Sequence, residues 1–349
     1  MSHRDGRLKA LYFDEHGGPE VLKYGDLPDP RPGAGEALVR VRAVALNHLD
    51  LWVRQGWPGL NLPKPHVGGS DVAGQVAGYG PSANGPAIGT RVVIDPGVVL
   101  GEDEWTNRGE ESVSPHYHLL GEGLPGGCAE YVVVPARNLM PIPDGVDFPR
   151  AAAPILVGLT AWRMLVHRAR LKPGESVAIV GAGGGVNSFS IQVAKYLGAT
   201  VYAITSTTEK MRKAQELGAD QVISYHGEDW SKTIYHLTGK RGVDVIVDNV
   251  GRATINASMR ALARGGRIVI VGNTSGPKAE IDLRFIFGKQ ISLIGSTMGS
   301  HQDFCEVMSL VWLGKLKPVI DRLLPLSEGR AAHEVLASGQ QFGKVVLTV

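Results

Sequence analysis

The stretch from Val177 to Asn187 constrains the fold of this chain most strongly. It reads VAIVGAGGGVN: an apolar run that predicts a buried strand, a glycine-rich turn, and the start of a helix expected over roughly residues 186–197. Glycine adopts backbone conformations that other residues avoid, and it lets a ligand come close to the main chain. A helix that begins at such a turn presents free N–H groups to a phosphate. The stretch therefore predicts a nucleotide-binding fold.

The glycine turn departs from the dinucleotide-binding pattern G-x-G-x-x-G. Read from Gly181, the sixth position is Val186, and read one residue later it is Asn187. In either register the glycine that permits close packing of the helix is missing. Because asparagine tolerates unusual backbone angles, we expect a loosened turn that still binds its ligand. The predicted contacts to a pyrophosphate are Gly183, Gly184, Gly185 and Val186.

The last residue of the second strand, expected over residues 199–205, occupies the position that selects the cofactor. An acidic residue there binds the ribose 2′-hydroxyl of NAD, whereas small polar and basic residues suit the 2′-phosphate of NADP. This chain has Thr205 at that point, followed by Ser206 and, a few residues on, by Lys210, Arg212 and Lys213. The missing acid favours NADP(H), bound by Ser206 and Lys210. The alternative is that these cations only solvate a surface helix.

The two ends of the chain differ from its middle. Strands and helices alternate after the glycine turn, with strands expected over residues 221–224, 243–248, 267–271 and 291–295. Such alternation predicts an α/β fold with a parallel sheet covered on both faces. The first 150 residues instead carry short β runs, a short helix capped by Asn47 and ended by Gly56, and a long loop over 97–127. We expect one helix over 148–169, and a last strand over 344–349 that returns to the first domain.

Length and charge exclude several classes of protein. A chain of 349 residues favours two domains. With 36 Lys and Arg against 34 Asp and Glu, the net charge of +2 predicts no partnership with nucleic acid or a membrane surface. No apolar run approaches the roughly 20 residues that span a bilayer, and the N-terminus lacks a signal peptide, so we expect a cytoplasmic protein. Cys128 and Cys305 are expected to be small buried apolar residues.

Several short stretches together resemble the medium-chain dehydrogenase/reductase family, in particular its quinone oxidoreductase and alcohol dehydrogenase branches. They follow the family's order over nearly the whole chain: GGPEVL (17–22), ALNHLD (45–50), GTRVV (89–93), GGCAEY (126–131), LTAW (159–162), QVAK (192–195), LGAD (217–220) and FGKV (342–345). The resemblance implies a GroES-like β-barrel catalytic domain of residues 1–153 and 302–349, a Rossmann domain of residues 154–301, and an active site in the cleft between them. It also implies a homo-oligomer paired through the last Rossmann strand, and further cofactor contacts at Thr160, Tyr225, Asn249, Gly272, Asn273 and Lys344.

The zinc sites of this family are altered here. At the catalytic zinc site, the zinc-dependent members have a cysteine where this chain has Asn47, and Gly-His-Glu where it has Gly69, Ser70 and Asp71. An amide and a hydroxyl are poor zinc ligands, so we expect no catalytic zinc. The four structural-zinc cysteines are replaced by Leu100, Asp103, Thr106 and Ser114. Whether His116, His118 and Asp103 bind another metal is left open.

Without zinc, direct carbonyl reduction lacks its electrophile, whereas hydride addition to an activated C=C bond or a quinone needs less help. The sequence therefore predicts an NADPH-dependent reductase of small enones, enals or quinones. Candidate catalytic residues are Asn47 and Ser70 as hydrogen-bond donors, with Asp50 and Arg54 on the short helix. The alternatives are that Asn47 only caps the helix and that Asp50 and Arg54 form a salt bridge. Two other functions stay open, an alcohol dehydrogenase with unexpected metal ligands and a non-catalytic nucleotide-binding protein.

Overall fold

The computed structural model describes residues 6–227 and 229–349. The chain divides into two compact units. Unit 1 comprises Met1–Leu156, Ser300–Met308 and Pro318–Val349, and unit 2 comprises Val157–Gly299 and Ser309–Lys317. The first and last parts of the chain thus share one unit. In the described ranges, no helix combines the length and apolarity that a membrane span requires.

Unit 2 is built on the parallel sheet that the sequence predicts. Its six strands are β11 (Ser176–Val180), β12 (Thr200–Thr205), β13 (Gln221–Ser224), β14 (Val243–Asp248), β15 (Leu262–Ile270) and β16 (Ser292–Gly295). They lie in the order β13-β12-β11-β14-β15-β16, and every neighbouring pair is parallel. The strand order reverses between β11 and β14. In open sheets of this kind, ligands bind beyond the carboxyl ends of the strands at that point.

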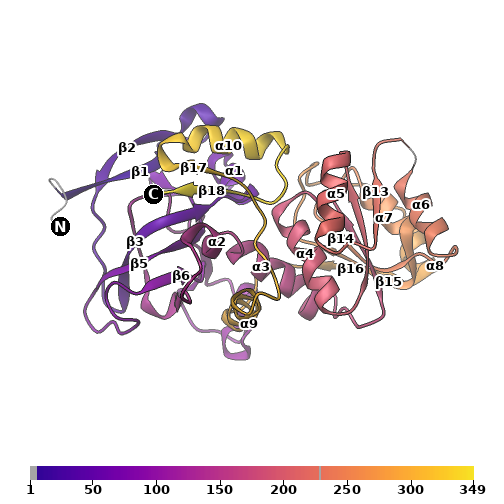
Figure 1. Ribbon diagram of the computed structural model, residues 1–349, viewed down its shortest axis with the longest axis horizontal. Coiled ribbons are helices and arrows are strands. Elements are labelled where there is room, and N and C mark those ends of the chain that lie inside the picture. Colours follow the sequence, from indigo (N-terminus) through magenta and orange to yellow (C-terminus); the bar gives the residue numbers. More distant parts are fainter. Residues whose placement is uncertain (1–5, 228) are drawn as a thin grey trace. The chain divides into compact units, whose positions relative to one another are not determined.

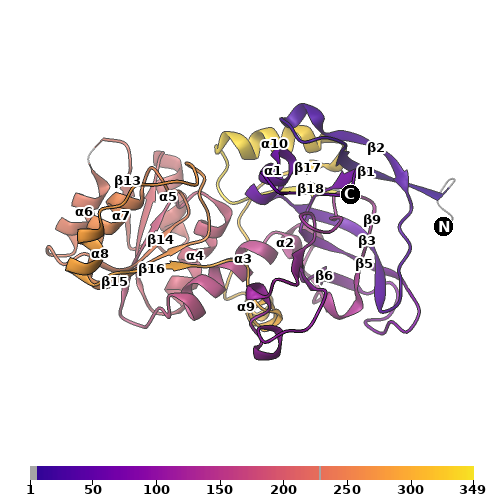
Figure 2. The ribbon, with the colours of Figure 1, turned by 180° about the vertical axis from the view of Figure 1, so that it is seen from behind.

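Helices cover both faces of this sheet. They are α4 (Gly185–Tyr196), α5 (Thr208–Glu216), α6 (Trp230–Leu237), α7 (Ile255–Ala261) and α8 (Leu283–Lys289). Helices α4 and α5 pack on one face, and α6, α7 and α8 pack together on the other (Figures 1 and 2). Val177, Ile179 and Val247 are fully buried between the two layers. Their strands are mainly apolar because neither face of the sheet meets water, and Asp244 is a polar exception within β14.

Unit 1 is mainly antiparallel. Its strands are β1 (Arg7–Phe13), β2 (Lys23–Pro28), β3 (Glu36–Ala45), β4 (His66–Val67), β5 (Asp71–Tyr79), β6 (Arg91–Ile94), β7 (Gly97–Val99), β8 (Tyr117–Leu119), β9 (Tyr131–Pro135), β10 (Leu139–Pro141), β17 (Ile320–Pro325) and β18 (Lys344–Thr348). The largest sheet has the order β10-β6-β5-β3-β18-β17, with β9 also paired to β3. As predicted, the C-terminal strand β18 returns to pair with β3 (Figures 1 and 2).

The helices of unit 1 include α1 (His48–Gln55), α2 (Phe148–Ala152) and α10 (Gly329–Ser338). Asn47 caps α1 and Gly56 ends it, as the sequence predicts. The single helix expected over 148–169 is wrong: α2 ends at Ala152, α3 (Ile155–Trp162) follows, and a π-helix covers Arg163–Arg168. Pro154 lies at the break because proline lacks an N–H donor and restricts the residue before it. Helix α9 (His301–Trp312) begins in unit 1.

Candidate functional site

The glycine turn of unit 2 is short and well bonded. Gly181 follows β11 with a φ of +81°, a conformation that favours glycine. The N–H groups of Gly181 and Ala182 both donate to Ile204 O at 2.9 Å, and Gly184 N donates to Gly181 O at 3.1 Å. Helix α4 starts at the next residue, so its N-terminal amides and positive dipole end lie at the carboxyl edge of the sheet.

Asn187 stabilises this turn, and the expected loosening is wrong. Its Nδ2 donates to Val180 O at 2.7 Å and to Gly181 O at 3.0 Å, and its Oδ1 accepts from Asn249 Nδ2 at 2.6 Å. The residue lies inside α4, so it adopts helical rather than unusual backbone angles. Its buried amide instead connects the ends of β11 and β14, the two strands at which the sheet order reverses.

Ser206 and Lys210 lie beside the glycine turn. Ser206 directly follows β12, and Thr207 caps α5 by accepting a hydrogen bond from Lys210 N at 3.2 Å. The Lys210 side chain extends over Gly183, where an added Cβ would lie 3.5 Å from Lys210 Nζ. Lys213 instead pairs with Glu209 on the helix surface at 2.9 Å, and Arg212 pairs with Glu216. Arg212 and Lys213 therefore fit the description of paired surface cations, whereas Lys210 lies over the glycine turn.

Most other predicted cofactor residues follow strands of the same sheet. Tyr225 comes after β13 and is 49% exposed. Asn249 comes after β14, and its Oδ1 accepts from Val271 N at 3.1 Å. Gly272 packs against the Asn249 main chain, and Asn273 accepts from Gly276 N at 2.8 Å. Thr160 is buried on α3, with its hydroxyl 3.9 Å from the Met298 sulfur.

Lys344 belongs to unit 1 and forms part of a buried polar cluster. Its Nζ donates to Asp71 Oδ2 at 2.8 Å and also to Asn47 Oδ1. Asn47 Nδ2 donates to the same Asp71 oxygen at 3.0 Å, which closes a triangle of three side chains. Lys344 is 4% exposed and Asp71 is fully buried. Burial raises the pKa of Asp71, while the Lys344 ammonium and the Asn47 amide oppose that rise.

Asp50 fixes the start of α1 to a neighbouring turn. Its carboxylate accepts from Asn47 N at 2.7 Å and from Gly69 N at 2.8 Å. Burial raises the pKa of Asp50 to about 6, and these two backbone donors oppose the rise. Among the described residues, no salt bridge joins Asp50 and Arg54, so the alternative that they pair is wrong. Arg54 instead donates to Gly17 O at 3.2 Å and to His333 Nδ1 at 3.2 Å.

The donor set of this cluster does not fit a zinc ion. Ser70 is fully buried, and its hydroxyl hydrogen goes to Leu120 O at 2.7 Å. Protein-bound zinc takes thiolate, imidazole and carboxylate ligands. Here Asn47 and Ser70, which occupy the positions of zinc ligands in the family resemblance, carry an amide and a hydroxyl. The nearby Asp71 carboxylate already binds the Lys344 ammonium.

The four positions that resemble structural-zinc ligands lie in the lobe after β7. Asp103 Oδ1 accepts from Trp105 N and Thr106 N, both at 2.9 Å, and its Oδ2 accepts from Ser114 Oγ at 2.7 Å. Three of the four positions are therefore joined by hydrogen bonds, while Leu100 is 59% exposed. Hydrogen bonds from Thr106 N and Ser114 lower the pKa of Asp103. The Asp103 carboxylate thus links two of the other positions, Thr106 and Ser114, by hydrogen bonds.

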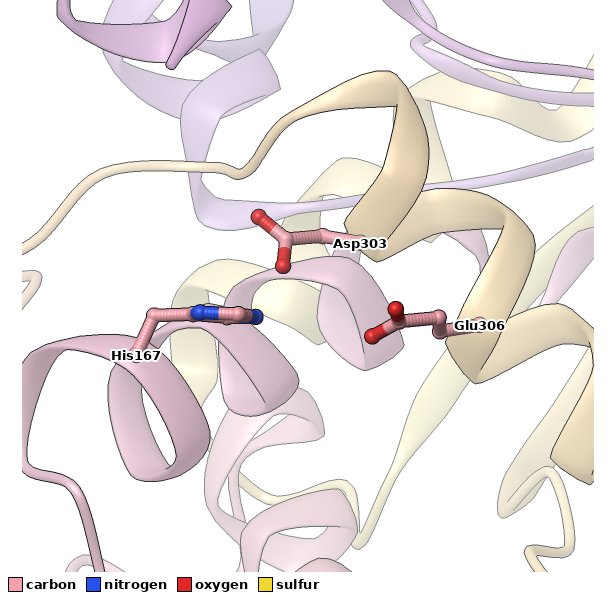
Figure 3. A group of neighbouring side chains, drawn as sticks. All are labelled: His167, Asp303 and Glu306. Atoms are coloured by element: carbon pink, nitrogen blue, oxygen red, sulfur yellow. The ribbon is translucent and has the colours of Figure 1, made fainter. Parts of the chain in front are cut away.

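Two other groups bear on metals. Among the described residues, His116, His118 and Asp103 are not a set close enough to share one ion. Asp303 and Glu306 project from α9 and are drawn with His167 in Figure 3. His167 belongs to unit 2, and two carboxylates on one helix do not by themselves make a metal site.

Two family models match the chain. Residues 33–144 match the alcohol dehydrogenase GroES-like domain, and residues 185–312 match the zinc-binding dehydrogenase domain. The quinone oxidoreductase of Pseudomonas aeruginosa is 32% identical, over 97% of this chain and 99% of that protein. The chain belongs to the medium-chain dehydrogenase/reductase family. It therefore combines a GroES-like domain with a Rossmann-type sheet, and it is an oxidoreductase of a family that uses a nicotinamide cofactor.

Solved structures of this family resemble the whole chain. An NAD-dependent alcohol dehydrogenase is 43% identical with a TM-score of 0.95, over 98% of this chain and 99% of that one. A cobalt- and zinc-bound thermostable alcohol dehydrogenase from Pyrobaculum aerophilum is 34% identical with a TM-score of 0.88, over 98% of this chain and all of that one. Relatives thus include proteins named for NAD and proteins that bind zinc.

Two side-chain contacts of this protein are not evident from its sequence. The sequence shows Asp71 only as part of the altered zinc motif, whereas the structure shows that it is the buried partner of Lys344. Cys128 is buried as expected, but Cys305 is half-buried beside His301, four residues earlier on α9. The spacing of four residues between His301 and Cys305 was the available signal for the second partnership.

Proposed function

We propose that the protein is a zinc-independent oxidoreductase that transfers hydride from NADPH to an activated C=C bond or a quinone. The observation that supports this most is the buried ammonium of Lys344, bound to Asp71 and Asn47 where zinc-dependent relatives use metal-binding residues. A fixed cation beside Asp71 disfavours a second cation there. The proposal therefore favours substrates whose reduction does not depend on a metal-polarised carbonyl.

The cofactor residues have separate roles in this proposal. When bound, the nicotinamide supplies the hydride. The N-terminus of α4 and the glycines at 183–185 receive the pyrophosphate, and Ser206 and Lys210 bind the 2′-phosphate. Tyr225 borders the adenosine, and Asn249, Gly272 and Asn273 border the cofactor at the ends of β14 and β15. Asn187 is a positioning residue because its amide holds both strand ends.

The unit 1 residues proposed for catalysis are assigned positioning roles. The donors of Asn47, Ser70 and Arg54 bond inside the unit, and Asp50 accepts two backbone N–H groups. Addition of hydride to the β-carbon of an enone would move charge onto its oxygen, and a proton taken from water would then add at the α-carbon to complete the saturated product. The cluster keeps the segment around Asn47 and Gly69 rigid, which favours a defined substrate pose.

The first test measures NADPH consumption by the purified protein with enones, quinones and aldehydes, in the presence of a chelator. We expect turnover of enones or quinones that is unchanged by the chelator, in protein with much less than one zinc per chain. Stoichiometric zinc with chelator-sensitive alcohol oxidation would instead establish the alcohol dehydrogenase alternative. Cofactor binding without turnover of any substrate would support the non-catalytic alternative.

Cofactor choice has a separate test at Lys210. The Lys210→Glu substitution places a carboxylate beside the 2′-phosphate, so we expect kcat/KM with NADPH to fall by about 10- to 100-fold while the value with NADH changes far less. Lys213→Glu makes the same charge change on the same helix and is the matched control. Equal effects of the two substitutions, or a wild-type preference for NADH, would contradict the assignment.

The remaining proposals concern assembly and location. Strand β16 ends the sheet of unit 2, and Ser292, Leu293 and Gly295 are exposed on it. An exposed strand edge favours pairing with another chain, which supports a homo-oligomer joined through β16. A cytoplasmic location also remains part of the proposal.

A further inference from the structure

Asp95, His301 and Cys305 form a line of side chains within unit 1. His301 Nδ1 lies 2.8 Å from Asp95 Oδ2, and His301 Nε2 lies 3.5 Å from Cys305 Sγ. The Asp95 side chain is 5% exposed, whereas that of His301 is 53% exposed. A thiol, an imidazole and a carboxylate in this order are the parts of an activated nucleophile.

Two elements bring the three residues together. Asp95 follows β6, and its Oδ1 accepts from Gly97 N at 3.1 Å. His301 begins α9, and Cys305 lies four residues later on the same face of that helix. The Asp95 carboxylate accepts a hydrogen bond from His301 Nδ1–H in this arrangement, so the neutral ring has Nε2 free of a proton and able to accept one from the thiol. The tautomer follows from the hydrogen-bond partners.

We propose that Cys305 is a nucleophilic thiol that forms covalent adducts with soft electrophiles of the α,β-unsaturated carbonyl class, with His301 as its base and Asp95 as the residue that orients His301. The Sγ atom forms a bond to the β-carbon as the thiol proton moves to His301 Nε2. The C=C electron pair shifts toward the carbonyl oxygen, and the proton then returns to the α-carbon. The product is a thioether, and no oxidant or reductant takes part.

Burial and neighbouring charges keep the Cys305 thiol protonated, so its reactivity depends on His301 as a base. Burial raises the pKa of Cys305, and the negative charges of Asp95 and Glu306 add to that effect, so the resting thiol is protonated at neutral pH. The hydrogen bond to Asp95 raises the pKa of His301, and burial opposes it. Other charges that act on His301 are those of Glu111, which raises its pKa, and Arg137, which lowers it. Adduct formation should therefore slow as acid protonates His301.

The experiment treats the purified full chain with N-ethylmaleimide at pH 7, without NADPH, and follows each cysteine by peptide mass spectrometry. We expect Cys305 to be alkylated, while Cys128, which is 1% exposed, reacts only after denaturation. His301→Gln should slow alkylation of Cys305 at least ~10-fold, because general-base catalysis contributes that much or more. Asp95→Asn should also slow it, and His116→Gln is the matched control for loss of a histidine.

Equal rates of alkylation in the wild type and the folded His301→Gln variant would overturn the proposal, because Cys305 would then be an ordinary accessible thiol. A wild-type Cys305 that resists N-ethylmaleimide would overturn it as well. The His301 side chain is half exposed, so circular dichroism should show that this variant folds even if Asp95→Asn does not. The readout does not involve hydride transfer, so its outcome is independent of the proposed function.

Discussion

Replacing Lys344 by methionine is expected to destabilise the protein by about 3–5 kcal/mol at pH 8, because the substitution leaves the Asp71 carboxylate buried without its counter-ion. Methionine retains most of the side-chain volume, so the loss reports the charge rather than a cavity. Asp71 has no exposed surface, and water cannot replace the ammonium without opening the unit. Urea unfolding of the wild type and the variant, followed by circular dichroism, measures the difference.

The loss should depend on pH in a known direction. Without Lys344 the folded-state pKa of Asp71 rises further above its unfolded value, so the folded state binds more protons and its stability falls as pH increases. The variant should therefore be less impaired at pH 5 than at pH 8. In the Asp71→Asn, Lys344→Met double variant neither position carries a charge, and we expect most of the stability to return. A Lys344→Met protein as stable as the wild type at pH 8 would contradict this account.

The sheet of unit 2 was predictable because its strands are buried on both faces. Val177 to Val180 is an apolar run, and Val243 to Val247 is apolar except for Asp244. Turn residues bound both strands, and their order along the chain leaves few topologies. Strand β17 was not predicted because its side chains carry no clear periodicity. It reads IDRLLP at the edge of a sheet, and Leu323 is 52% exposed.

The sequence indicates which residues belong to the site better than it indicates the hydrogen bonds between them. Sequence reasoning singled out Asn47 and Lys344, but 297 residues separate them, and nothing local indicates that their side chains meet. The glycine pattern concerns only the space around the backbone, so it marks Asn187 as a weakened position. Its value lies in three side-chain hydrogen bonds to segments that only the folded sheet brings near. Asp103 likewise gains its role from Ser114, eleven residues away.

The pair of Arg54 and His333 should make the protein sensitive to acid. Burial and the nearby Arg54 charge lower the pKa of His333 to about 3, whereas an unfolded histidine titrates near 6.5. Between these values the unfolded state binds more protons, so the free energy of unfolding falls as pH decreases through that window. A difference of about 3.5 pKa units corresponds to about 5 kcal/mol over the whole window, of which about 2 kcal/mol falls between pH 7 and pH 5.

His333→Gln tests this contribution directly, because glutamine offers Arg54 an acceptor oxygen and does not titrate. At pH 7 we expect the variant to be no more stable than the wild type. Between pH 7 and pH 5 the free energy of unfolding of the wild type should fall by about 2 kcal/mol more than that of the variant. His116→Gln removes a histidine at an exposed position of the same unit and is the matched control. If the free energies of unfolding of His333→Gln and the wild type changed equally with pH, His333 would take up its proton in the folded state. Arg54 would then have to release His333 Nδ1 without unfolding, which the burial of both side chains disfavours.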